Sequence, residues 1–169
     1  MKYIIRPPQE IYTFDYPFSN LANDDIHQYI SDCKNYDHGV NLQAKMTGWQ
    51  TREPMFLKIA RFVEMQIPNV VPNSNNTLDS NLELESIWGV YYGKGDFSEP
   101  HKHRLGNWSF VYFVNAPKNS SPLVFTNTRI KIKPKEGMCV LFNSNIEHHV
   151  PKNKSEGRSV IAGNFKFRS

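Results

Sequence analysis

The 169-residue sequence has only two cysteines, no internal repeat and no long hydrophobic run. Cys33 and Cys139 lie far apart without a CxxC spacing, which favours a reducing interior, with a disulfide between them as the alternative. No run approaches the roughly 18 apolar residues of a membrane helix. The N-terminal MKYIIRPPQE also lacks the apolar core of a signal peptide. We therefore expect a soluble, cytoplasmic protein with no membrane association.

Strong charge of either sign is absent as well. The chain has 20 Lys and Arg residues against 16 Asp and Glu, a formal net charge of +4. Basic residues are more frequent in the last third, but they form no run of five like charges. This mild bias suggests an anionic ligand or partner and gives no clear nucleic-acid signal.

Aromatic residues and turn formers, in contrast, are abundant, with 11 Phe, 8 Tyr, 3 Trp, 11 Pro and 9 Gly. After Asn81, short β-branched and aromatic runs are separated by turn residues at intervals of roughly 8–12 residues. About eight strands at this spacing are typical of a sandwich or a closed jelly roll. The expected strands are Leu82–Tyr92, His101–His103, Asn107–Asn115, Leu123–Thr126, Arg129–Ile132, Met138–Asn143, His148–Val150 and Arg158–Phe167.

The first half has a different, helical pattern. A helix is expected within Leu21–Cys33, with Asn23 or Asp24 as its cap. A second helix is predicted for Pro54–Ile67, because Pro54 suits a first turn and Pro68 would end the helix.

Weaker signals complete the first half. Tyr3–Ile5 is a candidate short strand, GVNLQAKMTGWQT a candidate for another, and the loop VPNSNNTLDSN the expected place of a flexible insertion. We expect one domain over residues 1–169, in which 1–80 is a helical support and 81–169 is the jelly-roll core.

One stretch, from Tyr92 to Val114, contains a His-x-His pair after a glycine-containing turn. In an extended chain residues i and i+2 point to the same side, so His101 and His103 would direct their imidazoles at one point. Such a point is most simply a metal ion. Alone the pair is weak evidence, since two surface histidines beside a turn give the same pattern.

Two later residues strengthen this hypothesis. His148 or His149 opens a short strand, and alternation allows only one of them to face inward; we favour His148 because Ile146 and Val150 would share its face. Ten residues after His148, Arg158 begins an apolar strand. If it is buried there, its guanidinium needs an anionic partner and suits a carboxylate; the alternative is a surface arginine after a turn.

Taken together, these segments resemble the Fe(II)/2-oxoglutarate-dependent oxygenase superfamily, in particular its prolyl-hydroxylase-like and phage-encoded members. The resemblance covers about residues 82 to 167 well and the first half loosely. It is carried by WGVYYGKGD from Trp88, PHKH from Pro100, WSFVYFV from Trp108 and FNS…HHV from Phe142, with MTGW from Met46. It implies a mainly β fold, a double-stranded β-helix (jelly roll) preceded by two helices.

The resemblance also implies an activity. Such enzymes couple oxidative decarboxylation of 2-oxoglutarate to hydroxylation, here of a protein side chain or a small molecule. The metal Fe(II) would be held by His101, His103 and His148, and the co-substrate 2-oxoglutarate by Arg158 and Tyr92, with ascorbate as a supporting reductant. No catalytic residue is implied beyond the metal ligands. Tyr92 has a structural alternative as a packed core aromatic.

The sequence departs from the family pattern at two positions. His103 stands where relatives carry Asp or Glu, and Val160 where they often carry Ser. An imidazole at residue 103 removes one negative charge and would weaken Fe(II) retention, although imidazole suits iron.

These departures leave two other functions open. One is a non-catalytic jelly-roll binding or phage structural protein with a relic metal site, and the other a three-histidine, cupin-like dioxygenase that does not use 2-oxoglutarate. A phage origin would place the protein in a bacterial host. The substrate and the oligomeric state are not predicted by the sequence.

Overall fold

The computed structural model describes residues 10–35, 41–70, 82–103, 106–128 and 130–168. Within them the chain forms two helices, α1 (Ser19–Asp32) and α2 (Pro54–Val70). The strands are β1 (Ile11–Asp15), β2 (Leu42–Gln43), β3 (Lys45–Met46), β4 (Leu82–Tyr92), β5 (Phe97–His101), β6 (Trp108–Asn115), β7 (Leu123–Phe125), β8 (Ile130–Ile132), β9 (Met138–Asn143), β10 (His148–Val150) and β11 (Arg158–Phe167). The prediction of a mainly β fold with two helices is confirmed.

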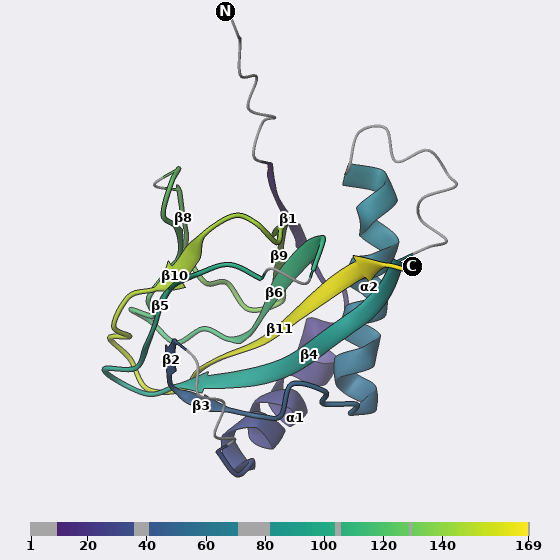
Figure 1. Cartoon of the computed structure of the whole chain (residues 1–169). Coiled ribbons are helices and arrows are strands. Elements are labelled where there is room, and N and C mark those ends of the chain that lie inside the picture. Colours follow the sequence, from purple (N-terminus) through teal and green to yellow (C-terminus); the bar gives the residue numbers. More distant parts are fainter. Residues whose placement is uncertain (1–9, 36–40, 71–81, 104–105, 129, 169) are drawn as a thin grey trace, which may run out of the picture.

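The strands form two antiparallel sheets (Figure 1). The larger has the order β1-β9-β6-β11-β4-β3 and the smaller the order β2-β5-β10-β7-β8. Buried side chains from both sheets meet between them, for example Val90 of β4, Phe125 of β7 and Val150 of β10. This space between the sheets is called the sandwich interior below.

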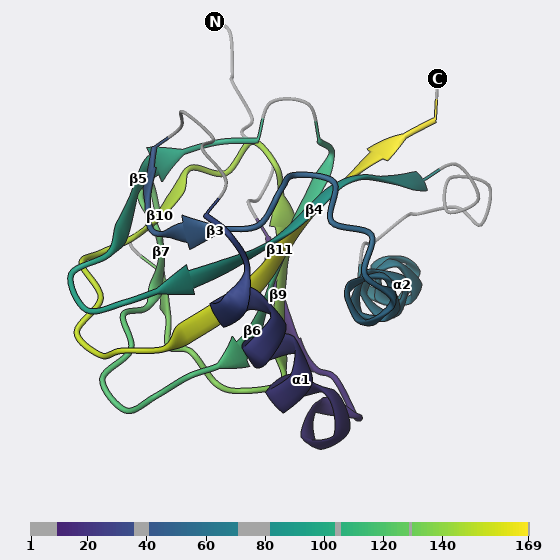
Figure 2. The same ribbon diagram turned by 90° about the horizontal axis from the view of Figure 1, so that it is seen from below.

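Both helices cover the other face of the larger sheet (Figure 2). Ile26 and Ile30 of α1 and Phe56 of α2 are fully buried there. Gly89 in β4 permits this close packing, because a Cβ at that position would lie 2.7 Å from the Ile30 side chain and 3.0 Å from the Phe56 ring. The larger sheet is therefore buried on both faces, which explains the nearly continuous apolar runs in its strands.

The helix boundaries differ from the expected ones. Because α1 begins at Ser19, Asn23 and Asp24 lie inside the helix and neither caps it. The Asn23 amide instead donates to the Val114 carbonyl at 2.8 Å and accepts from the Tyr112 hydroxyl at 2.5 Å. Helix α2 continues two residues past Pro68, since a proline near a helix end removes only one backbone hydrogen bond.

The first half contributes more than helical support. Strand β1 pairs with β9, β2 with β5 and β3 with β4, so both sheets include N-terminal strands. Strands of two residues, such as β2 and β3, are too short to produce a readable period, and no strand was expected at β1. The strand expected at Tyr3–Ile5 and the insertion expected within residues 71–81 lie outside the described residues.

Most C-terminal strands match their predicted ranges closely, but the strand expected at His101–His103 does not. Strand β5 covers Phe97–His101 and ends at the first histidine. His103 leaves the ladder because its backbone N–H donates to the Ser144 carbonyl at 2.9 Å, in the turn after β9.

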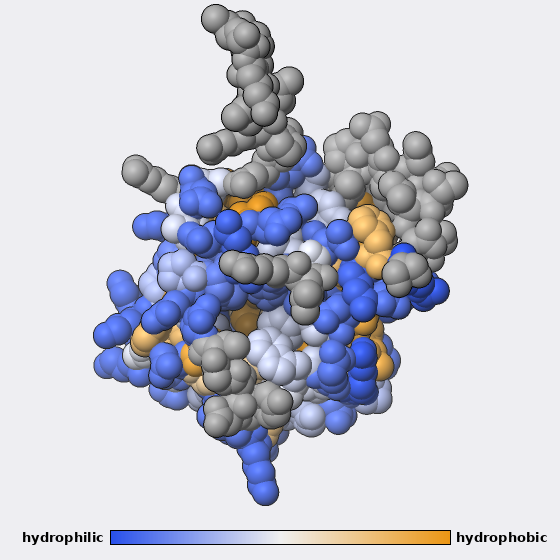
Figure 3. Space-filling view, viewed as in Figure 1, coloured by the Kyte–Doolittle hydropathy of each residue, from blue (hydrophilic) through white to orange (hydrophobic). Residues whose placement is uncertain are grey.

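Cys33 and Cys139 are both free thiols. Neither of the two described helices is long and apolar enough to cross a membrane. In the view of Figure 3 the surface is mainly hydrophilic, and hydrophobic side chains appear only in small areas.

Candidate metal centre

The three predicted histidines lie together at one end of the smaller sheet. Strands β5 and β10 pair so that His148 stands opposite His101, while His103 follows β5 after one intervening residue. One ring nitrogen from each histidine lies within 4.8 Å of the others. The ring centroids are 4.4 to 5.2 Å apart. Three imidazole nitrogens at this separation can serve as ligands to a single metal ion.

Each imidazole is oriented by a hydrogen bond from its Nδ1 atom. His101 Nδ1 donates to the Glu99 carbonyl at 2.7 Å, His148 Nδ1 to the Ile146 carbonyl at 2.9 Å, and His103 Nδ1 to the Asn164 side-chain oxygen at 2.7 Å. A carbonyl oxygen only accepts, so Nδ1 carries the hydrogen and Nε2 keeps its lone pair. His103 Nε2 is buried and has no hydrogen-bond partner among the described residues, as expected for a nitrogen that can bind a metal.

Burial also keeps the three rings neutral. It lowers the pKa of His103 to about 4 and the pKa of His148 well below its usual value, and the neighbouring histidines add to both effects. Burial likewise lowers the pKa of His101. Only a neutral imidazole binds a metal, so the site is ready for metal near neutral pH without losing protons.

The lowered pKa values predict that the metal-free protein loses stability in mild acid. Between the ordinary histidine pKa of 6.5 and about 4, the unfolded chain binds a proton at His103 that the folded protein does not bind. The free energy of unfolding should therefore fall as the pH falls through this window, by about 3 kcal/mol, or roughly 10 °C in Tm, from His103 alone. Thermal melts from pH 7 to pH 4 measure this slope; a His103→Gln variant should flatten it, and an equal slope in both proteins would contradict the assignment.

His149, the alternative third ligand, lies outside this cluster. It is half-buried, and its Nδ1 atom is 3.2 Å from the Thr126 hydroxyl oxygen. His148 is only 4% exposed, and Ile146 and Val150 are buried with it, as strand alternation predicts.

Arg158 begins β11 in the sandwich interior and is completely buried. None of its three guanidinium nitrogens has a hydrogen-bond partner among the described residues. Its guanidinium carbon lies 4.5 Å from the centre of the Tyr92 ring and 5.5 Å from that of Phe113. Burial lowers the pKa of Arg158, although the Tyr92 phenol offsets part of this effect. A buried cation without an anionic or hydrogen-bonded partner among the described residues is costly, so the arrangement suits an anionic ligand.

Tyr92 stands directly opposite Arg158 in the β4–β11 pairing and is itself buried. Burial raises the pKa of its phenol, so the hydroxyl stays protonated. Tyr92 is thus a packed core aromatic and also a neighbour of the guanidinium, while its contact with 2-oxoglutarate stays a prediction.

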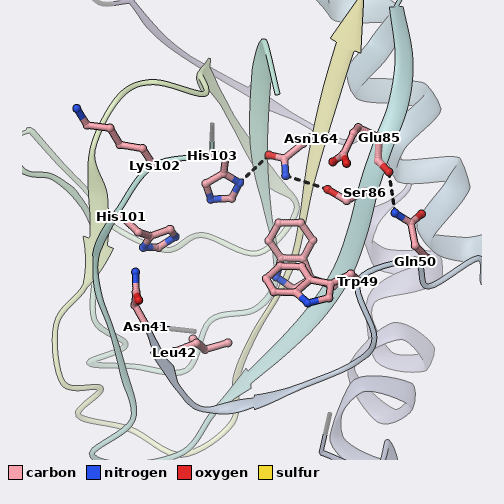
Figure 4. Close-up of a pocket in the computed structure, with 11 residues that line it drawn as sticks. Asn41, Leu42, Trp49, Gln50, Glu85, Ser86, His101, Lys102, His103 and Asn164 are labelled. Atoms are coloured by element: carbon pink, nitrogen blue, oxygen red, sulfur yellow. Dashed lines mark hydrogen bonds between the residues drawn. The ribbon is translucent and has the colours of Figure 1, made fainter. Parts of the chain in front are cut away.

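A cavity of about 350 Å³ opens beside His101 and His103 (Figure 4). Trp49 and Trp88 meet edge to face there at 4.6 Å, and Trp88 stacks on His103 at 5.7 Å between ring centroids. The volume is at the lower end for small-molecule pockets. The lining residues are Asn41, Leu42, Trp49, Gln50, Glu85, Ser86, Trp88, His101, Lys102, His103 and Asn164.

Sequence reasoning missed Asn164, which lines the cavity and contacts His103. The available signal was an amide in the apolar segment VIAGNF of β11. A polar side chain in such a strand needs buried partners, and the sequence alone did not indicate which residues these are.

No family model matches the sequence, and no curated protein is significantly similar to it. Several solved structures, in contrast, are similar to the structure of this chain. The viral collagen prolyl hydroxylase vCPH of Paramecium bursaria Chlorella virus-1, solved with 2-oxoglutarate, matches with a TM-score of 0.72 and 14% identity over 92% of this chain and 94% of that chain. A Pseudomonas putida prolyl-4-hydroxylase matches with a TM-score of 0.70 and 16% identity over 95% and 94% of the two chains.

HygX from Streptomyces hygroscopicus, solved with nickel, 2-oxoglutarate and hygromycin B, matches with a TM-score of 0.65 and 11% identity over 94% of this chain and 83% of that chain. Identities this low establish the fold only. The chain has the double-stranded β-helix fold shared by the 2-oxoglutarate- and Fe(II)-dependent oxygenases.

Proposed function

We propose that the protein is an Fe(II)- and 2-oxoglutarate-dependent dioxygenase that hydroxylates a protein side chain or a small molecule. The observation that carries the proposal is the combination, in one fold, of three imidazole nitrogens within 4.8 Å of one another and a buried guanidinium with no hydrogen-bond partner among the described residues. The three histidines suit a metal and the guanidinium suits a carboxylate, and the proposed reaction needs both groups.

The donor set fits iron. His101, His103 and His148 would hold the ion through neutral imidazoles, a ligand type that suits Fe(II), and three protein ligands leave positions free for other molecules. When bound, the iron would supply the redox chemistry that couples 2-oxoglutarate decarboxylation to C–H hydroxylation.

Side chains of the protein would bind the co-substrate. Arg158 would bind the distal carboxylate of 2-oxoglutarate, because its planar fork matches a carboxylate and its three nitrogens have no hydrogen-bond partner among the described residues. Tyr92 and Phe113 shield this ion pair from water and so strengthen it.

The cavity beside the histidines would receive the group to be hydroxylated. Its volume of about 350 Å³ suits one amino-acid side chain or a small molecule. The rings of Trp49 and Trp88 provide an apolar wall next to His103, against which such a group can be held close to the metal.

The direct test is succinate formation. We expect the purified protein, loaded anaerobically with Fe(II) and then given 2-oxoglutarate, ascorbate and air, to release succinate above a matched sample loaded with Zn(II). A slow release without substrate is sufficient, and candidate peptides and small molecules should accelerate it. Iron retention without 2-oxoglutarate consumption would instead favour the cupin-like dioxygenase, and failure to retain any divalent metal would favour a relic site.

A further inference from the structure

Asn164 joins His103 to a network of buried polar side chains on the larger sheet. Its Oδ1 atom accepts from His103 Nδ1 and from the Ser109 hydroxyl, both at 2.7 Å, and its Nδ2 atom donates to the Ser86 hydroxyl at 2.9 Å. Ser109 continues the network to Ser144 at 2.8 Å. Asn164, Ser86, Ser109 and Ser144 are all less than 9% exposed (Figure 4 draws Asn164, Ser86 and His103).

We propose that Asn164 is a positioning residue that keeps His103 in the tautomer able to bind metal, an inference that rests on the proposed metal-binding role of His103. Metal-binding histidines usually donate their second N–H to a fixed acceptor. His101 and His148 use backbone carbonyls for this purpose, whereas His103 uses a side chain. Of the three histidines, His103 is therefore the one whose orientation depends on the side chain of another residue.

The orientation of the Asn164 amide decides which tautomer His103 adopts. With Nδ2 directed at Ser86, Oδ1 faces His103, so His103 Nδ1 must be protonated and Nε2 keeps its lone pair. If the amide were reversed, its N–H would donate to His103 Nδ1, the ring hydrogen would move to Nε2, and the atom directed at the metal could no longer be a ligand. In this arrangement the Ser86 hydroxyl accepts from Nδ2, and the amide oxygen left facing His103 fixes the tautomer of the imidazole.

The position of this amide in β11 makes its polar partners necessary. Residues on the same face of β11, Val160 and Ala162, are apolar and pack in the sandwich interior. A buried amide among such residues is tolerated only when its polar atoms are satisfied, and here one of them is satisfied by His103 itself.

Metal titration of three variants tests the proposal. With Co(II) or Ni(II) followed by calorimetry, Asn164→Ala should bind about 10- to 100-fold more weakly than wild type, the usual effect of losing such an acceptor. Asn164→Asp presents oxygen atoms only and cannot donate, so it should bind at least as tightly as wild type. The control Asn107→Ala removes an amide that bonds to the Phe167 backbone away from the histidines, and its affinity should not change.

Two outcomes would overturn the inference while leaving the proposed function intact. One is an Asn164→Ala variant with wild-type affinity, and the other is an equal loss in Asn164→Ala and Asn164→Asp, which indicates a packing role. A wild type that binds neither metal would count against the proposed function itself.

The tautomer can be measured separately in the metal-free protein, where folding is first verified by the dispersion of the spectrum. Two-bond ¹H–¹⁵N correlations of the histidine rings should report Nδ1–H for His103 in wild type and Asn164→Asp. Asn164→Ala should show a mixture with Nε2–H, and an unchanged tautomer in this variant would contradict the proposal whatever the metal affinities are.

Discussion

Replacing His148 by alanine is expected to lower the affinity for Co(II) or Fe(II) by more than 100-fold. The His148 ring centroid lies 4.4 Å from that of His101 and 5.1 Å from that of His103, and His148 is the most deeply buried of the three. Its loss removes one of the three proposed ligands, so the effect should exceed the roughly 10- to 100-fold typical of residues that merely support a ligand. Calorimetric titration of the metal-free variant gives the affinity, and succinate formation should fall to the metal-free background.

The adjacent histidine provides the matched control. His149→Ala changes the same residue type one position along β10 but affects a ring that faces Thr126 and lies outside the cluster. It should keep the wild-type affinity. A variant His149→Ala that loses the metal while His148→Ala retains it would show that the ligand assignment is wrong.

Replacing Arg158 by methionine should have two effects of opposite sign. Binding of 2-oxoglutarate should weaken by about 30-fold to several thousandfold, which corresponds to the roughly 2–5 kcal/mol lost when one member of a buried charged pair is truncated. The ligand-free protein should become more stable, by about 1–4 kcal/mol, because methionine removes a buried cation for which the described part of the chain provides no hydrogen-bond partner. Thermal melts with and without 2-oxoglutarate measure both quantities on one sample.

Metal affinity should not change in Arg158→Met, which separates loss of the co-substrate from loss of the metal. Arg158→Lys retains the charge without the planar fork and should fall between wild type and Arg158→Met in 2-oxoglutarate binding. Full dioxygenase activity in Arg158→Met would show that Arg158 is not needed to bind 2-oxoglutarate. It would favour a three-histidine dioxygenase that does not use 2-oxoglutarate.

The sequence predicted the parts of the fold that have a strong local pattern. The long apolar strand Leu82–Tyr92 and the helix beginning at Pro54 are where their residues indicated, because periodicity and turn residues agree there. The three histidines were predicted to meet because a His-x-His pair and a later strand histidine are compatible with neighbouring strands.

What the sequence did not predict depends on contacts between distant segments. Asn23 has the local features of a helix cap, yet its partners on β6 determine that it lies within the helix. Likewise, nothing near Asn164 in the sequence indicates that its amide oxygen faces His103, 61 residues away. Polar groups of this kind are placed by the completed fold, because only tertiary structure brings their partners to them.

The cavity wall beside Trp88 has a consequence for how the protein can diversify. Asn41, Leu42, Trp49 and Gln50 line the cavity from the first third of the chain, whereas the histidines and Arg158 come from later strands. The stretch of gene that encodes residues 41–50 can therefore change what the cavity accepts without altering any proposed metal ligand. Random mutagenesis confined to these codons would be an efficient route to altered ligand selectivity in an otherwise unchanged protein.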